Sequence, residues 1–404
     1  MTTPTTKARG FVQGTDPTHE PEIQGASSDD PLRILYLCGG SYVSGMEIIE
    51  LAIMQGLKAR GHDVHCVVSG WNDGDFISRL TEAGIPHTVA FTGKFSLSPR
   101  PKHLWWTIDA LRHLPGARRT VRRQLDAFRP DVVVACNRDT VLGLRGVFRD
   151  YPVVYHLHEA PVVTSWNQRM MAALAKQCEL IVTVSEFVGG RLVDLGVSSE
   201  KIQVVYNGLP ITQRTGMGEN GVFTAGICGQ IGPWKGHEDL IEALGLLEAR
   251  GVPFRCLVFG TGDPEFEERL QHRAVSLGIA DRIEWRGFVR DQEALYRELD
   301  TAVVPSRVGD PLPTVALEAG ARGIPVVVTQ IGGLPEIVVD GETGYLVPVE
   351  RPAELAARLE TLATDSAKRS QMGAAGRERV RRKFAPERMV REHEEVLRRV
   401  AALW

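Results

Sequence analysis

The segment PSRVGDPLPTVALEAGARGIPVVVTQIGGLPEIVVDGETGYL, residues 305–346, is the part of the chain that decides its fold. Pro311 and Pro313 restrict the backbone just before Thr314, a residue suited to the N-cap of a helix. We expect that helix to run to about Arg322, and a buried β-branched strand to follow it. The segment therefore predicts one helix-and-strand unit of a parallel α/β sheet.

Two acidic residues, Asp310 and Glu318, lie on either side of the start of this helix. The free backbone N–H groups of the helix N-terminus lie between them and carry partial positive charge. Carboxylates accept hydrogen bonds from sugar hydroxyls, and a helix N-terminus binds phosphate. The pattern indicates a site for a phosphate joined to a polyol, as in a nucleotide sugar, although an exposed acidic loop is the simpler alternative.

Short apolar runs extend the alternation of strand and helix in both directions along the chain. In the first half we expect buried strands at 32–38, 63–68, 131–136, 153–158 and 180–185. In the second half we expect them at 223–229, 254–260, 282–287, 301–306 and 325–329. A helix at Met46–Arg60 would turn Ile48, Leu51, Ala52 and Leu57 inward. The pattern predicts two parallel, Rossmann-like halves joined by the polar, Gly-rich segment 207–221.

The length and composition of the chain indicate a globular protein with two domains. It has 404 residues, of which 43% are hydrophobic and 24% charged, with a formal net charge of −3. That charge gives no reason to expect nucleic acid as a partner. No apolar run reaches the roughly 18–20 residues of a membrane-spanning helix.

Two further features concern the N-terminus and the cysteines. Residues 1–30 are rich in Thr, Pro, Gly and acidic residues and lack the apolar core of a secretory signal, so we interpret them as a disordered tail.

The six cysteines form no CxxC pair, and five lie in strand-like apolar runs. We therefore expect buried, reduced thiols and a cytoplasmic protein.

Three short stretches could carry chemistry. The sequence GQIGPWKG, residues 229–236, follows the first strand of the second half and would place Lys235 near a phosphate, unless it is only a turn. The loop GGSYVSGMEII, residues 39–49, precedes a helix and lacks the dinucleotide-binding GxGxxG spacing. His156 and His158 lie on one face of a strand end; no third metal ligand is evident, since Glu159 should face the other way.

The chain resembles the retaining GT-B glycosyltransferases of family 4, or group 1, in their paired-acid signature. The motifs that carry the resemblance are Asp310-x7-Glu318, the AxGxPVV that follows it, and GGLPEIV. The resemblance extends from about Leu32 to the C-terminus. It implies two Rossmann-like domains facing across a cleft, an N-terminal acceptor domain at 31–207 and a C-terminal donor domain at 208–385. It also implies that a final helix at 386–404 crosses back to the N-terminal domain.

The same resemblance implies roles for individual residues. Glu318 would hold the ribose, Asp310 the donor sugar, Lys235 the diphosphate, and RGFV at 286–289 the nucleobase. The implied catalytic residues are His158, Lys235 and Asp310. The implied donor contacts are Gly45, Gln230, Lys235, Arg286, Gly287, Val289, Asp310, Leu312, Thr314, Val315 and Glu318, and the acceptor contacts are Glu47 and His156. No metal and no cofactor are expected.

Three positions depart from the family pattern. Asp310 stands where the family usually has Glu, and Gln230 where it has the Arg that binds the leaving diphosphate. An amide cannot bind phosphate bidentately as a guanidinium does, so Lys235, with help from Arg307, would have to do more. Pro313 replaces a Gly and removes one backbone N–H.

A basic stretch suggests a partner. Residues 100–129 hold eight Lys and Arg residues against two Asp, together with Trp105 and Trp106. A basic helix with aromatic residues can lie on an anionic membrane, which would suit a lipid-linked acceptor. The alternative is an ordinary solvated helix face.

The sequence thus predicts a retaining, metal-independent transferase that moves a sugar from a nucleotide diphosphate sugar to an acceptor in cell-surface glycan, glycolipid or related glycoconjugate biosynthesis. Two alternatives stay open: a GT-B sugar-nucleotide epimerase, and a non-catalytic nucleotide-sugar-binding subunit. The choice between UDP and GDP, the sugar, the acceptor and the oligomeric state are not determined by the sequence.

Overall fold

The computed structural model describes residues 30–38, 43, 45–92, 95, 101–212 and 221–404. Residues 32–404 form one compact unit, separate from residues 1–31. The tail expected at 1–30 therefore lies, apart from Asp30, outside the described residues, as does most of the loop at 39–44.

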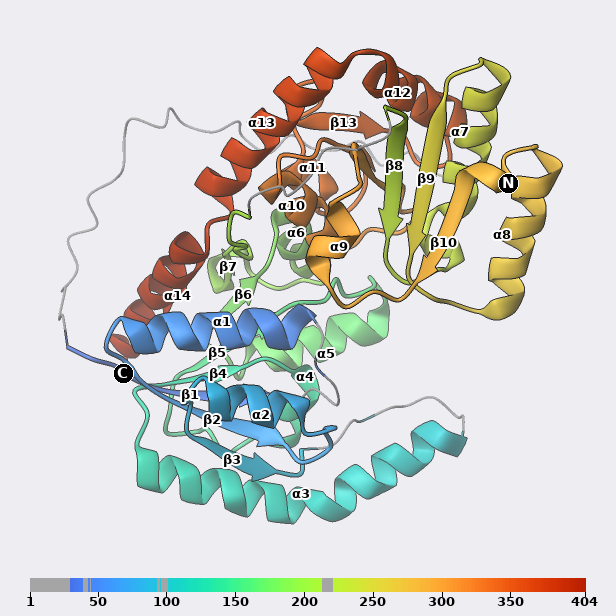
Figure 1. The fold of residues 1–404 in the computed structure, drawn as a ribbon. Helices are drawn as coiled ribbons and strands as arrows, with labels where there is room; N and C mark the ends of the chain where they lie inside the picture. The colour runs from blue at the N-terminus through green and yellow to red at the C-terminus, as the bar shows by residue number, and fades with distance from the viewer. Residues whose placement is uncertain (1–29, 39–42, 44, 93–94, 96–100, 213–220) are drawn as a thin grey trace. The chain divides into compact units, whose positions relative to one another are not determined.

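The first sheet has seven parallel strands in the order β3-β2-β1-β4-β5-β6-β7 (Figure 1). Its strands are β1 (Arg33–Cys38), β2 (Asp63–Ser69), β3 (His87–Ala90), β4 (Val132–Ala135), β5 (Val153–Leu157), β6 (Leu180–Thr183) and β7 (Ile202–Val204). The strand order reverses beside β1, and in open α/β sheets a ligand binds at the carboxyl ends of the strands at such a point.

The second sheet repeats this design with six parallel strands in the order β10-β9-β8-β11-β12-β13. Its strands are β8 (Phe223–Cys228), β9 (Phe254–Phe259), β10 (Ile283–Gly287), β11 (Thr301–Val304), β12 (Val326–Thr329) and β13 (Gly344–Val347). The order reverses between β8 and β11, so each sheet has a switch point of its own. The expected GT-B architecture of two Rossmann-like sheets is confirmed.

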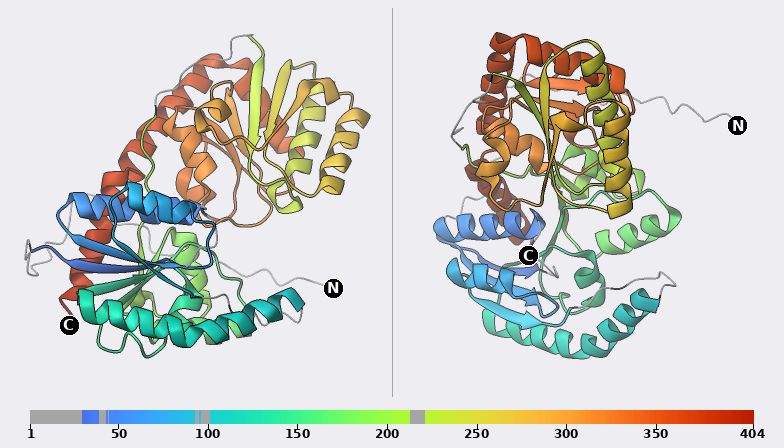
Figure 2. Two further views of the ribbon diagram at one scale, coloured as in Figure 1. Left: turned by 60° about the horizontal axis from the view of Figure 1, so that its bottom comes forward. Right: turned by 45° about the vertical axis from the view of Figure 1, so that its right-hand side comes forward.

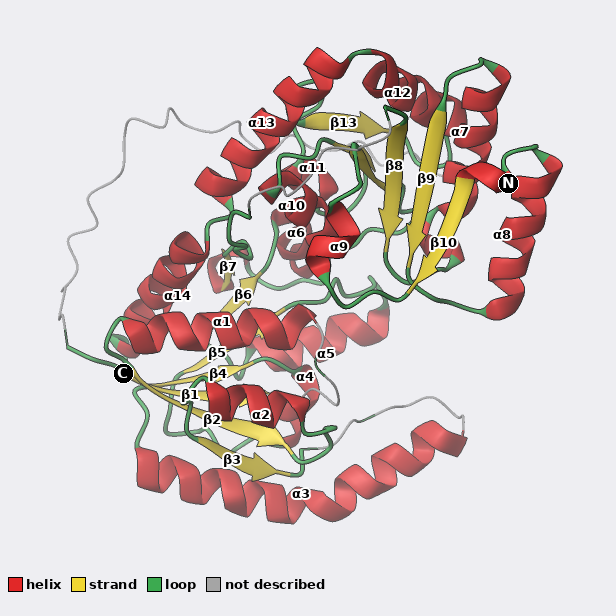
Figure 3. Ribbon diagram, in the orientation of Figure 1, coloured by secondary structure: helices red, strands yellow, loops and turns green. Residues whose placement is uncertain are grey.

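Helices cover the faces of both sheets (Figure 3). Those of the first half are α1 (Gly45–Ala59), α2 (Asp75–Glu82), α3 (Pro101–Phe128), α4 (Arg138–Gly143), α5 (Ser165–Ala175) and α6 (Glu186–Asp194). Those that follow are α7 (His237–Ala249), α8 (Pro264–Ser276), α9 (Gln292–Tyr296), α10 (Thr314–Ala321), α11 (Leu334–Ile337), α12 (Pro352–Thr364), α13 (Ser366–Lys383) and α14 (Pro386–Ala401). Among the described residues, no helix combines the length and apolar character needed to cross a bilayer.

The buried apolar side chains form three clusters. One packs α1, α2 and α14 on a face of the first sheet, and another packs α7, α8 and α12 on a face of the second. The third continues from the remaining face of the first sheet, under α3–α6, to α10 and α11 on the second. Burial on both faces explains why the central strands are uninterrupted apolar runs in the sequence.

The C-terminal helix α14 returns to the first sheet, as expected, and packs against α1 (Figures 1 and 2). Gly56 on α1 makes this close approach possible, because a Cβ there would lie 2.3 Å from the Cγ2 atom of Val390. A carboxylate oxygen of Glu394 lies 3.1 Å from Nε2 of His62, and Arg60 pairs with the same carboxylate. The helix thereby closes the core of the first half.

The structure corrects three local expectations. Helix α10 begins at Thr314 itself, and Pro313 occupies the N-cap without a side-chain hydrogen bond. Ile48 is 50% exposed, whereas Glu47 and Glu50 are buried on α1. Strands β3, β7 and β13 were not expected; each lies at the edge of a sheet and is only three or four residues long.

Candidate active site

A cavity of about 560 Å³ lies where both sheets present the carboxyl ends of their strands. From the first half it is lined by Gly45, Met46, His158, Glu159, Val184 and Asn207. From the second half it is lined by Ile227, Cys228, Lys235, Val303, Val304, Pro305, Ser306, Asp310, Pro311, Leu312, Pro313, Thr314 and Val315. Seven of the expected site residues thus surround one space: Gly45, His158, Lys235, Asp310, Leu312, Thr314 and Val315.

The start of α10 forms one wall of this cavity. Pro313 is extended, with φ −64° and ψ 114°, and the first helical residues Thr314 and Val315 line the cavity together with Leu312. The N–H groups of a first helical turn have no partner of their own within the helix. The Oγ atom of Ser185, just before α6, donates a 2.6 Å hydrogen bond to the carbonyl oxygen of Pro311. This bond ties the wall to the first half of the chain.

The turn GQIGPWKG brings Lys235 into the cavity. Gly236 has φ 72°, and a Cβ there would lie 1.9 Å from the carbonyl oxygen of Pro305, so only glycine fits. The Nζ atom of Lys235 lies 2.8 Å from Oδ2 of Asp310, and Ser306 Oγ donates to the same oxygen at 3.2 Å. The amine expected to bind diphosphate is therefore paired with the carboxylate expected to bind the sugar.

Arg307 does not take the place of the missing phosphate-binding arginine. Its guanidinium donates to both carboxylate oxygens of Asp239 at 2.8 and 2.7 Å and to Glu238 at 2.6 Å. These hydrogen bonds raise the pKa of Arg307 further and direct the side chain toward the start of α7. Three of its five guanidinium N–H groups are used in these bonds and Arg307 does not line the cavity, so nothing in this arrangement supports a contact between Arg307 and the diphosphate.

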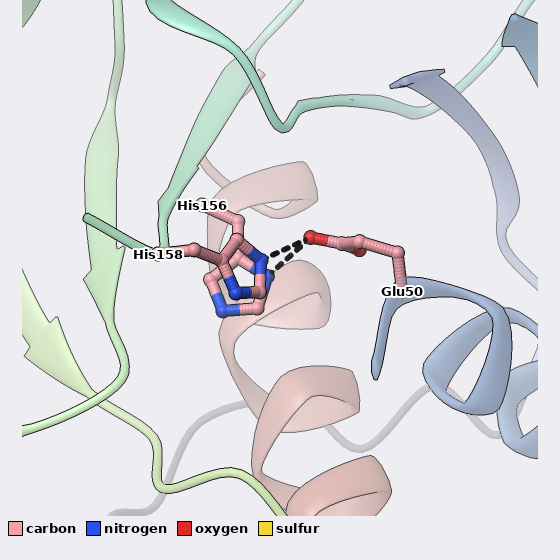
Figure 4. Close-up of side chains that lie close together, drawn as sticks. All are labelled: Glu50, His156 and His158. Carbon is pink, nitrogen blue, oxygen red and sulfur yellow. Dashed lines mark hydrogen bonds and ion pairs between the residues drawn. The ribbon is translucent and has the colours of Figure 1, made fainter. Parts of the chain in front are cut away.

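His158 rests on a buried carboxylate from α1. The Oε1 atom of Glu50 lies 2.7 Å from Nε2 of His158 and 2.7 Å from Nδ1 of His156 (Figure 4). Glu50 and His156 are each 1% exposed. Burial alone would raise the pKa of Glu50, but the two imidazoles outweigh it and hold that pKa well below its usual range. Burial and His158 lower the pKa of His156.

This cluster corrects the expectation that the two histidines have no third ligand nearby. Glu50, His156 and His158 each offer a ligand atom, and these atoms lie within 4.8 Å of one another. Both nitrogen–oxygen distances are hydrogen-bond lengths. As it stands, the cluster is a hydrogen-bonded support for His158.

Glu159 and Cys228 are two lining residues with chemistry that the sequence did not assign. Glu159 lines the cavity and lies 3.8 Å from Nη1 of Arg138, so the expectation that it faces away is wrong. Burial, with a contribution from the charge of Glu318, raises the pKa of Cys228 to about 12. Cys228 is therefore a protonated thiol and a poor nucleophile at neutral pH.

The remaining expected residues lie outside the lining of the cavity. Glu318 accepts a 2.7 Å hydrogen bond from the hydroxyl of Tyr296, and Arg286 pairs with Glu284 and Glu298. The full set outside the lining is Glu47, His156, Gln230, Arg286, Gly287, Val289 and Glu318. Their roles stay predictions.

Asn207 is a lining residue that sequence reasoning missed. It is buried, and its Oδ1 atom has no hydrogen-bond partner among the described residues. An unpaired buried amide oxygen beside a polar cavity is a candidate ligand contact. The available sequence signal was its position as the first residue of the Gly-rich segment that follows the strands of the first half.

Comparison with known families agrees with this arrangement. Residues 43–213 match the family described as Glycosyltransferase Family 4, and residues 219–379 match the family described as Glycosyl transferases group 1. The two matches are separated by residues 214–218 and together cover every strand of both sheets except β1. The chain belongs to glycosyltransferase family 4. This family, also called group 1, is of the retaining class and has the GT-B fold, as the resemblance implied.

Three similar proteins illustrate the relationship. The chain is 34% identical over 199 residues to a protein of Salmonella typhimurium named as a colanic acid biosynthesis glycosyltransferase, covering 46% of this chain and 48% of that protein. It is 38% identical over 151 residues to the D-inositol 3-phosphate glycosyltransferase of Corynebacterium efficiens. That alignment covers 36% of this chain and 35% of the relative. The alignment spans half or less of the length of these two relatives.

Among solved structures, the fold is similar to Anabaena Alr3699/HepE in complex with UDP. The TM-score is 0.75 and the identity 22%, and the alignment covers 91% of this chain and 100% of that one. At this identity the likeness establishes the shared fold alone.

Proposed function

We propose that this family 4 member is a retaining, metal-independent glycosyltransferase and that the cavity is its donor site. One observation carries the proposal: a cationic amine and the N-terminus of α10 border the same cavity as a carboxylate and an imidazole. The first pair suits a diphosphate, and the second pair suits a sugar. The cavity of about 560 Å³ is of the size that small-molecule sites have.

Each lining residue has a chemical part in this proposal. Lys235, the N–H groups at Thr314 and Val315, and the loop that ends at Gly45 would bind the diphosphate. Asp310 would accept hydrogen bonds from the donor sugar, and His158, held by Glu50, would lie beside it. Glu318 for the ribose and the segment 286–289 for the nucleobase would complete the donor site, with Gln230 contributing a weaker amide contact.

The arrangement suits cleavage of the bond between sugar and diphosphate. That step builds positive charge on the anomeric carbon and negative charge on the leaving oxygen. Lys235 and the helix N-terminus would stabilise the leaving oxygen electrostatically, without a metal. Cys228 is protonated and no carboxylate is assigned as a nucleophile, so we propose same-face substitution, in which the leaving phosphate accepts the proton of the acceptor.

The Lys235–Asp310 ion pair bears directly on donor binding. The two charges lie 2.8 Å apart, and each side chain is only 26% exposed. A donor would replace this pair with a phosphate on Lys235 and a sugar hydroxyl on Asp310. Donor binding therefore requires that the pair be separated. A nucleotide without a sugar would give Lys235 a new partner and would give Asp310 none.

The names of similar proteins suggest where the reaction belongs. The Salmonella relative is named for colanic acid biosynthesis, and the Corynebacterium relative acts on D-inositol 3-phosphate. We propose a role in cell-surface glycan, glycolipid or related glycoconjugate biosynthesis, at the cytoplasmic face of a membrane. The acceptor would be a glycan or a lipid-linked molecule, and the basic helix α3 would contact an anionic bilayer.

A thermal-shift panel tests the donor site. Wild type and Lys235→Ala are heated with UDP-, GDP-, ADP- and TDP-sugars, beginning with UDP-glucose, the ligand in one solved structure of Alr3699/HepE. A donor at about 100 times its dissociation constant adds about 2.7 kcal/mol to the free energy of unfolding. We expect one nucleotide class to raise Tm by a few degrees in wild type and not in the variant. No shift with any sugar nucleotide would contradict the proposal.

Product analysis separates the transferase from its alternatives. An epimerase would convert the donor sugar without any acceptor, whereas a transferase would release free nucleotide diphosphate and form a glycosylated product. A non-catalytic subunit would bind the donor but would not turn it over with any acceptor.

A further inference from the structure

A second cavity, of about 500 Å³, opens on the first half of the chain between α3, α4 and α5. It is lined by Phe95, Leu114, Arg118, Arg138, Asp139, Leu142, Gly143, Trp166, Asn167 and Met170. None of these residues belongs to the donor cavity, and only Leu114 and Arg118 lie in the basic stretch 100–129 that the sequence indicated as a membrane contact. The lining combines two guanidinium groups with aromatic and aliphatic side chains, which is the composition of a site for an anionic amphiphile.

The two arginines are only partly neutralised. Nε of Arg118 donates a 3.0 Å hydrogen bond to the carbonyl oxygen of Gly143, and Arg118 forms no ion pair with a carboxylate of the described residues. Arg138 lies 3.6 Å from Asp139, whose pKa is raised by burial. The cavity thus offers guanidinium N–H groups of Arg118 that are not used in a salt bridge, and a phosphate is their natural ligand.

The rim of this cavity is unusually apolar for a protein surface. On α3, Leu104, Trp105, Ile108 and Leu111 follow one another at helical spacing and are about half exposed. Across the opening, Trp166 at the start of α5 is 57% exposed, and Val162 just before it is also exposed. The N-terminal half of α3 extends past the strand ends, as Figures 1 and 2 show. A run of exposed apolar side chains along one helix suits contact with an apolar chain.

An ion pair connects the second cavity to the first. Arg138 lines the second cavity and Glu159 lines the donor cavity, and their side chains lie 3.8 Å apart. The linings of the two cavities therefore approach each other at this pair. An acceptor substrate requires a path between its anchoring point and the reacting sugar.

We propose that the second cavity is the acceptor subsite and that it holds the phosphate of a phosphate-linked lipid. Arg118 and Arg138 bind the phosphate, and the apolar chain lies along Trp166 and the exposed face of α3. The inference rests on the proposed transferase function, which it deepens by naming the class of acceptor. The basic residues further along α3, Arg119 and Arg123, would add attraction to an anionic membrane surface.

The test uses soluble probes, titrated into the full chain while Trp fluorescence is followed. Dodecyl phosphate, kept below its critical micelle concentration, carries both parts of the proposed ligand; inorganic phosphate and dodecyl maltoside each carry one. We expect dodecyl phosphate to bind at least tenfold more tightly than either. Equal binding of inorganic phosphate would mean a simple anion site, and equal binding of the maltoside would mean non-specific apolar contact; either result overturns the proposal.

Two variants and one control locate the site. We expect Arg118→Gln and Trp166→Ala each to weaken dodecyl phosphate binding at least fivefold. Arg123→Gln removes the same charge from the same helix without touching the cavity, and should change binding less than twofold. Equal losses in Arg118→Gln and Arg123→Gln would show that only general charge matters, and would overturn the proposal.

Failure of this inference can be told apart from failure of the proposed function. Arg118→Gln should keep the donor-induced rise in Tm, because it does not line the donor cavity. Lys235→Ala should lose that rise and keep dodecyl phosphate binding. Loss of the donor shift in wild type would contradict the transferase function, whereas unaltered probe binding in Arg118→Gln would contradict the acceptor subsite alone.

Discussion

Replacing Glu50 tests whether the buried carboxylate supports the candidate active site. Its Oε1 atom lies 2.7 Å from both His156 and His158, and the residue is 1% exposed. Removing Glu50 leaves one ring nitrogen of each histidine without its partner, and each buried group left unsatisfied costs about 1–3 kcal/mol. We therefore expect Glu50→Ala to lower the free energy of unfolding by about 3–5 kcal/mol. The variant Glu50→Gln keeps the side-chain volume and one hydrogen-bond acceptor, so we expect its free energy of unfolding to fall by only about 1.5–3 kcal/mol.

The pH dependence of this loss has a defined sign. The folded pKa of Glu50 lies well below its usual range, so the carboxylate contributes stability above the unfolded pKa of about 4.3. That contribution disappears as the pH falls through the folded value. His156 acts in the same direction, because its lowered pKa makes the unfolded state bind more protons below about pH 6.5. Wild type should lose stability on acidification, and its advantage over Glu50→Gln should be greatest above about pH 5.

Urea unfolding followed by circular dichroism at pH 7.5, 6.0, 5.0 and 3.5 measures both effects. Glu395→Gln is the control, because Glu395 is an exposed glutamate on α14 whose removal should cost less than about 0.5 kcal/mol. Equal stability of Glu50→Gln and wild type at pH 7.5 would refute the reasoning. Stoichiometric zinc in the purified protein would also refute the reasoning, because the cluster of Glu50, His156 and His158 would then be a metal site.

Three further changes test the donor cavity and its supports. Asp310→Asn frees Lys235 from its ion pair, so we expect UDP without a sugar to bind a few-fold more tightly in calorimetry; weaker binding would contradict the pairing. Gly236→Ala places a Cβ 1.9 Å from the carbonyl oxygen of Pro305 at φ 72°, so Tm should fall by several degrees, and an unchanged Tm would contradict the close packing. Glu336→Ala removes two 2.8 Å hydrogen bonds to backbone N–H groups at the start of α6, which should cost about 1–3 kcal/mol in urea unfolding; a loss below about 0.5 kcal/mol would show that they contribute little.

Sequence reasoning was most accurate where local chemistry decides the structure. The prolines at 311 and 313 and the glycine at 323 place the ends of α10 within one residue. The buried central strands were all found, because strands covered on both faces must be continuously apolar. Edge strands such as β3 were missed, because a short, half-covered strand needs no such run.

The side-chain partnerships depended on distances that the sequence does not contain. Lys235 and Asp310 are 75 residues apart, and their pairing follows from the close approach of Gly236 to Pro305. Glu50 looked like an ordinary polar residue of an amphipathic helix. Its burial depends on strand β5, which places His156, and His158 just after the strand, beside α1. His158 is 108 residues from Glu50 in the sequence.

The motifs of the sequence indicated the family by resemblance. The sequence by itself also determined the two Rossmann-like sheets and the residues of α10, because periodicity, proline and glycine act over a few neighbouring residues. Only the tertiary structure decided which charges meet. In that structure Arg307 pairs with Asp239 and Glu238, and Glu159 of the donor cavity lies beside Arg138 of the second cavity. Electrostatic and hydrogen-bonding partners are chosen by distances of a few ångströms in space, and those distances exist only once the strands have been brought side by side.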